Sequence, residues 1–94
     1  MDLDELRRQI DSVDRKLVEL LNQRAKLVEE VGKFKKRLGM DVYTPKREKE
    51  ILQLATGANG GPFSHTAILR LFERILDESR SLERKIAKDS GEKA

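Results

Sequence analysis

The sequence predicts an all-α protein with three helices, a very long first helix, a short second one and a third of medium length. Charged residues make up 39% of the chain and aromatic residues only 4%, a composition that favours helices over a β-rich fold. Apolar residues also recur at three- and four-residue steps, as expected for amphipathic helices. The segments around Gly39 and at Gly57–Pro62 separate the predicted helices.

The first helix is predicted to run from about Asp4 to Leu38, where the only glycine is Gly32 and there is no proline. Such a helix would be about 50 Å long at 1.5 Å per residue. A compact chain of this length has a radius of gyration of only about 12–13 Å. One chain therefore cannot cover the whole apolar stripe, and the sequence predicts a homodimer. The stripe consists of Leu6, Ile10, Val13, Leu17, Leu20, Leu21, Val28, Val31 and Leu38.

The second helix is predicted to begin at Thr44-Pro45, with threonine as the N-cap and proline at the first helical position, and to end at a Gly57 C-cap. After a loop at 58–62, the third helix is predicted to open near Ser64 or Thr66. We expect one helical domain over residues 1–88. Residues 89–94 are expected to form a flexible polar tail, which could be the remnant of a linker.

Several classes of function are disfavoured by composition. The chain has no cysteine and a single histidine, so no metal site or cofactor is predicted. It has no apolar run of membrane-spanning length, and its charged N-terminus is unlike a secretory signal, so we expect a cytoplasmic protein without a membrane partner. The 20 basic and 17 acidic residues nearly cancel, which argues against nucleic acid as a partner. A net charge of +3 is compatible with an anionic small molecule.

Charged and polar residues interrupt the apolar faces of all three helices. A single cation in such a stripe usually extends its charge to water. Two or three cations together need anions, because burying an unpaired charge costs several kcal/mol. The pattern alone leaves an anion-binding site and structural ion pairs equally open. The residues concerned are Arg24 and Lys35 within the first stripe, Arg7 at its edge, Glu48 on the second helix, and Ser79 and Glu83 on the third.

Four segments together resemble the motifs of the all-helical (AroQ-class) chorismate mutases. They are LRRQID near the start, the Arg24 segment running into EEVGKFK, then TPKREKEIL, and finally RLFERILDESRSLE. The resemblance covers Leu3 to Ile86. It implies an intertwined six-helix homodimer with shared active sites. The loop 60–63 and the polar tail are similar to the mutase domain that precedes a DAHP synthase in some bacteria.

The resemblance also implies roles for the basic residues. Arg7 would reach into the partner subunit's pocket and bind a substrate carboxylate. Arg24 would bind a carboxylate within its own subunit. Lys35 would donate a hydrogen bond to the ether oxygen and to a carboxylate, and Arg47 would support the site by packing and ion pairing.

The remaining site residues follow from the same resemblance. Glu48 would accept the substrate's ring hydroxyl, and Ser79 would contact a ring carboxylate. Glu83 would face the ether oxygen from the side opposite Lys35, and it could donate a hydrogen bond there only when protonated. Val31 and Leu76 would supply apolar wall. Many family members have Asp at the position of Thr44. Two roles therefore stay open for Thr44, a contact with the substrate's ring hydroxyl or only the N-cap of the second helix.

The implied reaction is the rearrangement of chorismate to prephenate in aromatic amino-acid biosynthesis, a pericyclic step that needs no nucleophile, metal or cofactor. Three alternatives stay open. One is a sensor domain for prephenate or chorismate attached to a DAHP synthase. Another is an isochorismate pyruvate lyase activity of a similar helical dimer. The third is a coiled-coil or nucleic-acid-binding helical dimer, which the near balance of charges disfavours.

Overall fold

The computed structural model describes residues 1–92, with side chains described through Asp89. The chain forms three helices, α1 (Leu3–Leu38), α2 (Pro45–Gly57) and α3 (His65–Glu92), and the described residues contain no strand. The all-α prediction, with its order of helix lengths, is therefore confirmed. No helix in the described range is both long enough and apolar enough to cross a membrane.

Helix α1 has strong signals at both ends. Asp2 is its N-cap, and the Asp2 Oδ1 atom accepts a hydrogen bond of 2.8 Å from the backbone N–H of Glu5. At the other end Gly39 adopts a left-handed conformation (φ 67°), and the N–H of Met40 donates to the Lys35 carbonyl at 2.8 Å. The last turn is also basic, which suits the negative end of the helix dipole. These caps delimit a helix of 36 residues.

The ends of α2 differ in part from the prediction. Thr44 is the N-cap, as predicted, but its side chain makes no capping hydrogen bond. The predicted C-cap at Gly57 is wrong, because the helix continues through Gly57 and the cap is Ala58 in a right-handed conformation. The N–H of Ala58 still reaches the Leu54 carbonyl at 3.0 Å, so this end needs no left-handed glycine.

Helix α3 begins where Ser64 caps it. The Ser64 Oγ atom accepts a hydrogen bond of 3.1 Å from the N–H of Ala67, which confirms the predicted opening at this serine. The helix continues to Glu92, beyond the predicted end at Lys88, because the polar residues after Lys88 include no proline to stop it. Residues 93–94 lie outside the described range. The division of the chain at Lys88 into a domain and a tail stays a prediction.

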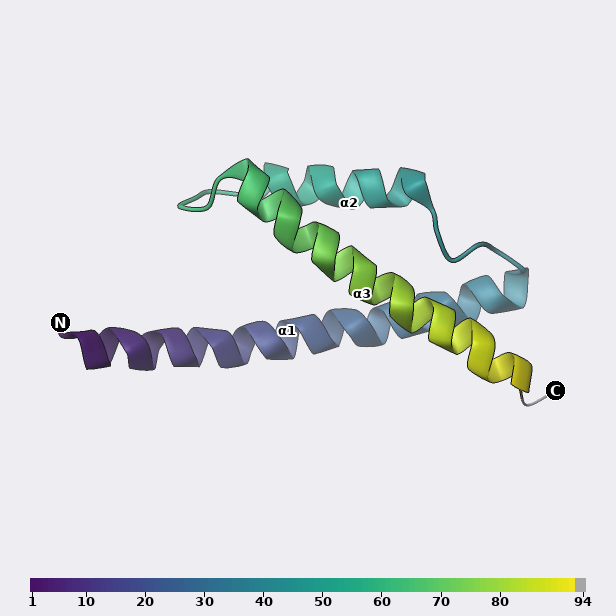
Figure 1. Ribbon diagram of the computed structural model, residues 1–94, viewed down its shortest axis with the longest axis horizontal. Helices are drawn as coiled ribbons and strands as arrows, with labels where there is room; N and C mark the ends of the chain where they lie inside the picture. Colours follow the sequence, from purple (N-terminus) through teal and green to yellow (C-terminus); the bar gives the residue numbers. More distant parts are fainter. Residues whose placement is uncertain (93–94) are drawn as a thin grey trace.

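Helix α3 joins the other two helices. It crosses the C-terminal half of α1 and packs along α2, whereas α1 and α2 make no close backbone contact within residues 1–92. The N-terminal half of α1 projects away from this crossing (Figure 1). The molecule measures 58 × 27 × 14 Å, and its radius of gyration of 16.8 Å exceeds the value of about 12–13 Å for a compact chain of this length.

Gly32 brings α1 and α3 close together at their crossing. It is buried, and a Cβ atom placed on it would lie 3.3 Å from Ile86 Cδ1 and 3.6 Å from the Glu83 Cα atom. A glycine here lets the α3 backbone approach α1 at the level of Glu83. The polar interior of the fold lies at this same level.

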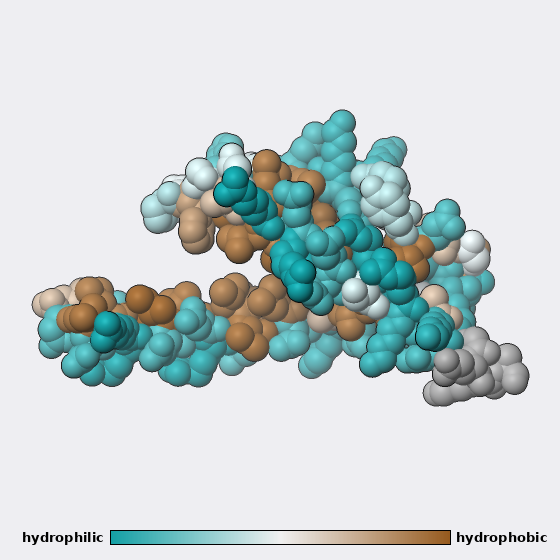
Figure 2. All heavy atoms as spheres, in the orientation of Figure 1, coloured by the Kyte–Doolittle hydropathy of each residue, from teal (hydrophilic) through white to brown (hydrophobic). Residues whose placement is uncertain are grey.

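The single chain has little apolar core. Leu76, at 5% exposure, is the only large apolar residue in the described range that is buried, and no side chain in that range is completely buried. The projecting half of α1 carries an uncovered stripe, which Figure 2 shows gathered along one side of the helix, facing the open space below α2. We call these residues the α1 stripe: Leu3, Leu6, Ile10, Val13, Leu17, Leu20 and Leu21, each 39–61% exposed.

Candidate active site

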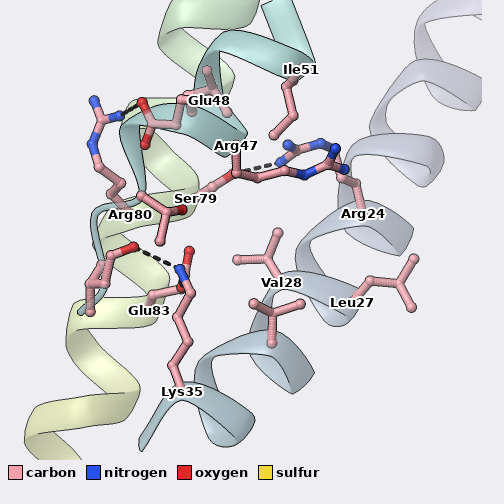
Figure 3. A pocket seen from close by; sticks show the side chains of 14 residues that line it. Arg24, Leu27, Val28, Lys35, Arg47, Glu48, Ile51, Ser79, Arg80 and Glu83 are labelled. Carbon is pink, nitrogen blue, oxygen red and sulfur yellow. Dashed lines mark hydrogen bonds and ion pairs between the residues drawn. The ribbon is translucent and has the colours of Figure 1, made fainter. Parts of the chain in front are cut away.

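A pocket of about 310 Å³ lies where the three helices meet, below α2 and beside the crossing of α1 and α3 (Figure 3). All three helices and the connector between α1 and α2 contribute to it. Apolar wall comes from Leu27, Val28, Val31, Val42, Ile51 and Leu76. The polar lining consists of Arg24, Lys35, Thr44, Arg47, Glu48, Ser79, Arg80 and Glu83.

Lys35 and Glu83 form a buried ion pair across the α1–α3 crossing. The Nζ atom lies 2.7 Å from Glu83 Oε1, and the two side chains are 11% and 10% exposed. Lys35 also donates a hydrogen bond of 2.7 Å to the Val42 carbonyl, which links it to the connector. Although the ion pair is short, Glu83 Oε1 has no hydrogen bond of good geometry. The attraction is therefore mainly between charges, and this oxygen lacks a well-directed donor.

Arg24 faces the pocket from α1 and has a neutral partner. Its Nη1 atom donates to Ser79 Oγ at 2.6 Å, and the serine hydroxyl donates in turn to the Ile75 carbonyl at 2.7 Å. Burial and the positive charge of Arg47 both lower the pKa of Arg24, and the negative charge of Glu83 opposes them only in part. Arg24 thus carries a positive charge that the surrounding side chains do not fully compensate.

Glu48 is held from its outer side by an arginine that the sequence analysis did not single out. Arg80 Nη1 donates to Glu48 Oε1, and Arg80 Nη2 donates to Asp77 Oδ1 one turn earlier on α3. The Arg80 and Glu48 side chains are 22% and 18% exposed. The hydrogen bond with Glu48 raises the pKa of Arg80. Glu48 is therefore part of an ion-paired group between α2 and α3.

Positive charge exceeds negative charge in the pocket. Four cations and two carboxylates line it, which leaves an excess of two positive charges. The described residues include no group of three or more His, Cys, Asp or Glu side chains placed to hold a metal ion. The lining has no cysteine or histidine either. The arrangement can bind a compact dianion and hold donors and fixed charges around it.

The pocket brings together nine of the ten site residues singled out in the sequence. They are Arg24, Val31, Lys35, Thr44, Arg47, Glu48, Leu76, Ser79 and Glu83. Arg7 is the exception. It is exposed on the projecting half of α1, about 25 Å from Arg24 along the helix axis at 1.5 Å per residue. A single chain cannot bring Arg7 into its own pocket.

The sequence profile of the family "Chorismate mutase type II" matches residues 6–84, which is most of the chain and covers α2 and the larger part of α1 and α3. The chain belongs to this family.

Solved structures and curated relatives agree with the family assignment. A chorismate mutase from Thermus thermophilus superposes with a TM-score of 0.85 at 40% identity, over 87% of this chain and 93% of that one. The bifunctional chorismate mutase/prephenate dehydratase of Aquifex aeolicus is 37% identical over 90% of this chain, and this chain spans 25% of its length. The chorismate mutase of Methanocaldococcus jannaschii is 24% identical over 97% of this chain and 93% of its own length.

Among the lining residues of this chorismate mutase family member, Arg80 is the polar one that sequence reasoning missed. It directly follows Ser79, so helical periodicity places it about 100° away, toward the edge of the apolar face. The i, i+3 spacing of Asp77 and Arg80 is typical of a local ion pair on a helix surface. Nothing in the sequence indicated that the arginine also reaches Glu48, 32 positions earlier.

Replacing Arg24 by methionine should stabilise the protein in the absence of substrate. A pKa below the ordinary value means that the charged form is less favourable in the folded chain than in the unfolded one, and at pH 7 the arginine is charged in both. The cost of this charge is then fully present, and Arg24→Met removes it. We therefore expect Tm at pH 7 to lie above that of wild type.

Circular dichroism at one fixed protein concentration measures this change in Tm. Arg15→Met is the matched control, because Arg15 is exposed on the same helix and its loss should leave the stability within about 0.5 kcal/mol of wild type. A Tm for Arg24→Met below that of wild type would contradict an uncompensated charge.

Proposed function

We propose that this protein is a chorismate mutase, which converts chorismate to prephenate in the synthesis of phenylalanine and tyrosine. The observation that carries the proposal is the excess of two positive charges around a small pocket at the meeting point of three helices. It matches a substrate with two carboxylates. Membership in the chorismate mutase type II family and the likeness to the Thermus enzyme support the same reaction.

The proposed reaction needs binding and charge placement more than acid–base chemistry. One C–O bond breaks as one C–C bond forms, electrons move around a six-membered ring, and no proton is transferred. The protein must hold the flexible dianion in its compact conformer, which is a contribution of proximity. It must also place donors where the breaking C–O bond gathers negative charge.

Arg24 and Lys35 are the proposed principal catalytic residues on α1. Arg24 is bonded to the neutral Ser79 hydroxyl, so its charge is available to a substrate carboxylate. The positive charge of Arg47 repels that of Arg24, and the same substrate carboxylate would attract both arginines, so Arg47 would support the site. Lys35 would donate to the ether oxygen, where its charge stabilises the transition state more than the bound substrate.

Glu83 is proposed to face the ether oxygen from the side opposite Lys35. Within the single chain Lys35 Nζ and Glu83 Oε1 are 2.7 Å apart. Two donors that share one oxygen must stand more than about 4 Å apart, because each hydrogen bond is about 2.8 Å long. The donor to the ether oxygen would therefore be the other oxygen, Oε2, or Oε1 after it has moved away from Lys35, and in either case the donating oxygen must carry a proton.

The other lining residues would bind and shape the substrate. Glu48 is proposed to accept the ring hydroxyl, and Ser79 to contact a carboxylate next to Arg24. Thr44 has a hydroxyl free of capping and lines the pocket, so it could contribute to the hydroxyl contact. Val31 and Leu76 provide apolar surface against the ring.

An intertwined homodimer with shared sites is part of the proposal. The α1 stripe is largely exposed, and burying such a surface against a second copy would add the core that the single chain lacks. Arg7 lies on the same projecting half of α1, so a partner that packs there brings its own Arg7 toward this chain's pocket. Each site would then need both chains.

The wider setting of the protein stays a prediction in three respects. A cytoplasmic location is one. Fusion to or association with a DAHP synthase, with a sensing role for the mutase domain, is another. The bifunctional relative from Aquifex aeolicus is instead named a chorismate mutase/prephenate dehydratase. Isochorismate pyruvate lyase activity is the third, and supplying isochorismate in the assay below would detect it.

Replacing Arg24 or Lys35 by alanine should lower kcat for chorismate by about 10²–10³-fold each, the scale of losing one oxyanion-hole donor. Loss of chorismate and appearance of prephenate are measured directly. Lys33→Ala is the matched control, since Lys33 is exposed two positions from Lys35 and pairs with Glu30 on the surface. Near-wild-type turnover in both alanine variants would exclude the assigned site.

Glu83→Gln should change the pH dependence of kcat/KM. The wild-type value should be lower at any pH at which Glu83 is ionised, because an ionised Glu83 cannot donate to the ether oxygen and repels the charge that develops there. The amide of glutamine donates at any pH, so the variant should show a flat profile over the same range. Identical profiles for the two proteins would show that the proton on Glu83 has no role.

Two inactive variants should restore activity when their subunits are mixed. Arg7→Ala damages the partner's site, and Lys35→Ala damages its own chain's site. A mixed dimer then has one site with both residues intact. After subunit exchange at equal amounts we expect about a quarter of wild-type activity, because half of the dimers are mixed and each has one intact site. No gain on mixing would contradict shared sites.

A further inference from the structure

Arg80 is held from three sides. It donates to Glu48 on α2 and to Asp77 on α3. Its guanidinium also lies over the ring of Tyr43 in the connector, with the Arg80 Cζ atom 5.7 Å from the ring centroid. In the view of Figure 3, Glu48 lies between Arg80 and Arg24. Arg80 therefore joins three segments of the chain on the outer side of the Glu48 carboxylate.

Arg80 and Arg24 differ in what their donors meet. Arg80 contacts two carboxylates, whereas Arg24 meets the neutral Ser79 hydroxyl. An arginine that already holds two carboxylates has little capacity left for a substrate anion. A planar guanidinium also fixes the direction of a carboxylate that it contacts. Arg80 is thus suited to act on Glu48 and through it on the substrate.

Glu48 presents a problem for a site that takes a dianion. It is a carboxylate 18% exposed at the wall of the pocket, where an unpaired negative charge would repel the substrate. A salt bridge from the outer side removes most of this repulsion while the carboxylate keeps an oxygen with which to accept a hydroxyl. A hydrogen bond to one oxygen, Oε1, leaves Oε2 for that purpose.

We propose that Arg80 is a positioning residue that neutralises and orients Glu48 from behind, so that the pocket admits a dianion and Glu48 can still accept the substrate hydroxyl. This inference rests on the proposed mutase function. It predicts that Arg80 matters only while position 48 is charged. Asp77 and Tyr43 hold the guanidinium in place on its other sides.

The test combines two substitutions and follows KM and kcat for chorismate. Arg80→Gln should raise KM by about tenfold or more with a smaller effect on kcat, because it leaves a bare carboxylate in the wall. Adding Glu48→Gln should lower KM again, to about the value of Glu48→Gln alone. A purely structural role makes the opposite prediction, because the double variant lacks the same salt bridge as Arg80→Gln and should bind no better.

Controls separate the outcomes. Arg84→Gln removes an exposed arginine one turn later, which donates a 3.4 Å hydrogen bond to Ser81, and should leave KM unchanged. Tm is recorded for each variant at one fixed protein concentration to show that each is folded. If Arg80→Gln does not fold, Arg80→Lys serves in the same cycle, with a smaller rise in KM because the charge is kept.

A KM in the double variant equal to or higher than that of Arg80→Gln overturns the role of Arg80. Failure of the proposed function has a different result, because wild-type protein would then not convert chorismate at all. Turnover by wild type with no recovery in the double variant rejects only the inference about Arg80.

Discussion

The ion pair between Lys35 and Glu83 is the interaction on which the arrangement of this protein depends. It joins α1 to α3 at a depth where both side chains are about nine-tenths buried. Buried charges of this kind must be paired, because an unpaired one costs several kcal/mol. The backbone makes the pairing possible, since Gly32 leaves room for α3 to approach α1 beside Glu83. The pocket forms around this crossing.

The electrostatics of the site follow from an imbalance of charge, because one of its cations, Arg24, has no carboxylate partner within the described part of the chain. Lys35 and Arg80 each have a carboxylate, whereas Arg24 has a serine hydroxyl and lies near another arginine. A structure selected for stability alone would either give Arg24 a carboxylate partner or replace it by an apolar residue. The lowered pKa of Arg24 reflects that cost. A bound dianion would supply the compensating charge, which connects the cost of burying Arg24 to the proposed function.

The length of α1 is the second constraint. A helix of 36 residues is longer than the rest of the chain can cover, and its N-terminal half carries leucines and an isoleucine into solvent. Burial of apolar surface is the dominant favourable term in folding, so an isolated chain of this shape has a small core for its size. Dimerisation and site completion by Arg7 would then be two consequences of the same long helix.

The sequence by itself determined the helices and most of the site. Periodic apolar residues and the signals at Gly39, Thr44-Pro45 and Ser64 predict all three helices, because these effects act over a few neighbouring residues. Interruptions of the apolar faces predict Arg24, Lys35 and Glu83, because a charge on a buried face conflicts with the local pattern. The motif resemblance added Thr44, Arg47 and two residues of the apolar wall, Val31 and Leu76.

Only the tertiary structure decided which of these charges meet. Lys35 contacts Glu83 directly, Arg24 meets Ser79, and Glu48 is held by Arg80. These pairs join residues 32 or more positions apart, so they depend on how α3 crosses α1 and lies along α2 and not on local periodicity. The end of α2 at Ala58 likewise depended on a backbone conformation that a glycine at 57 permits but does not require.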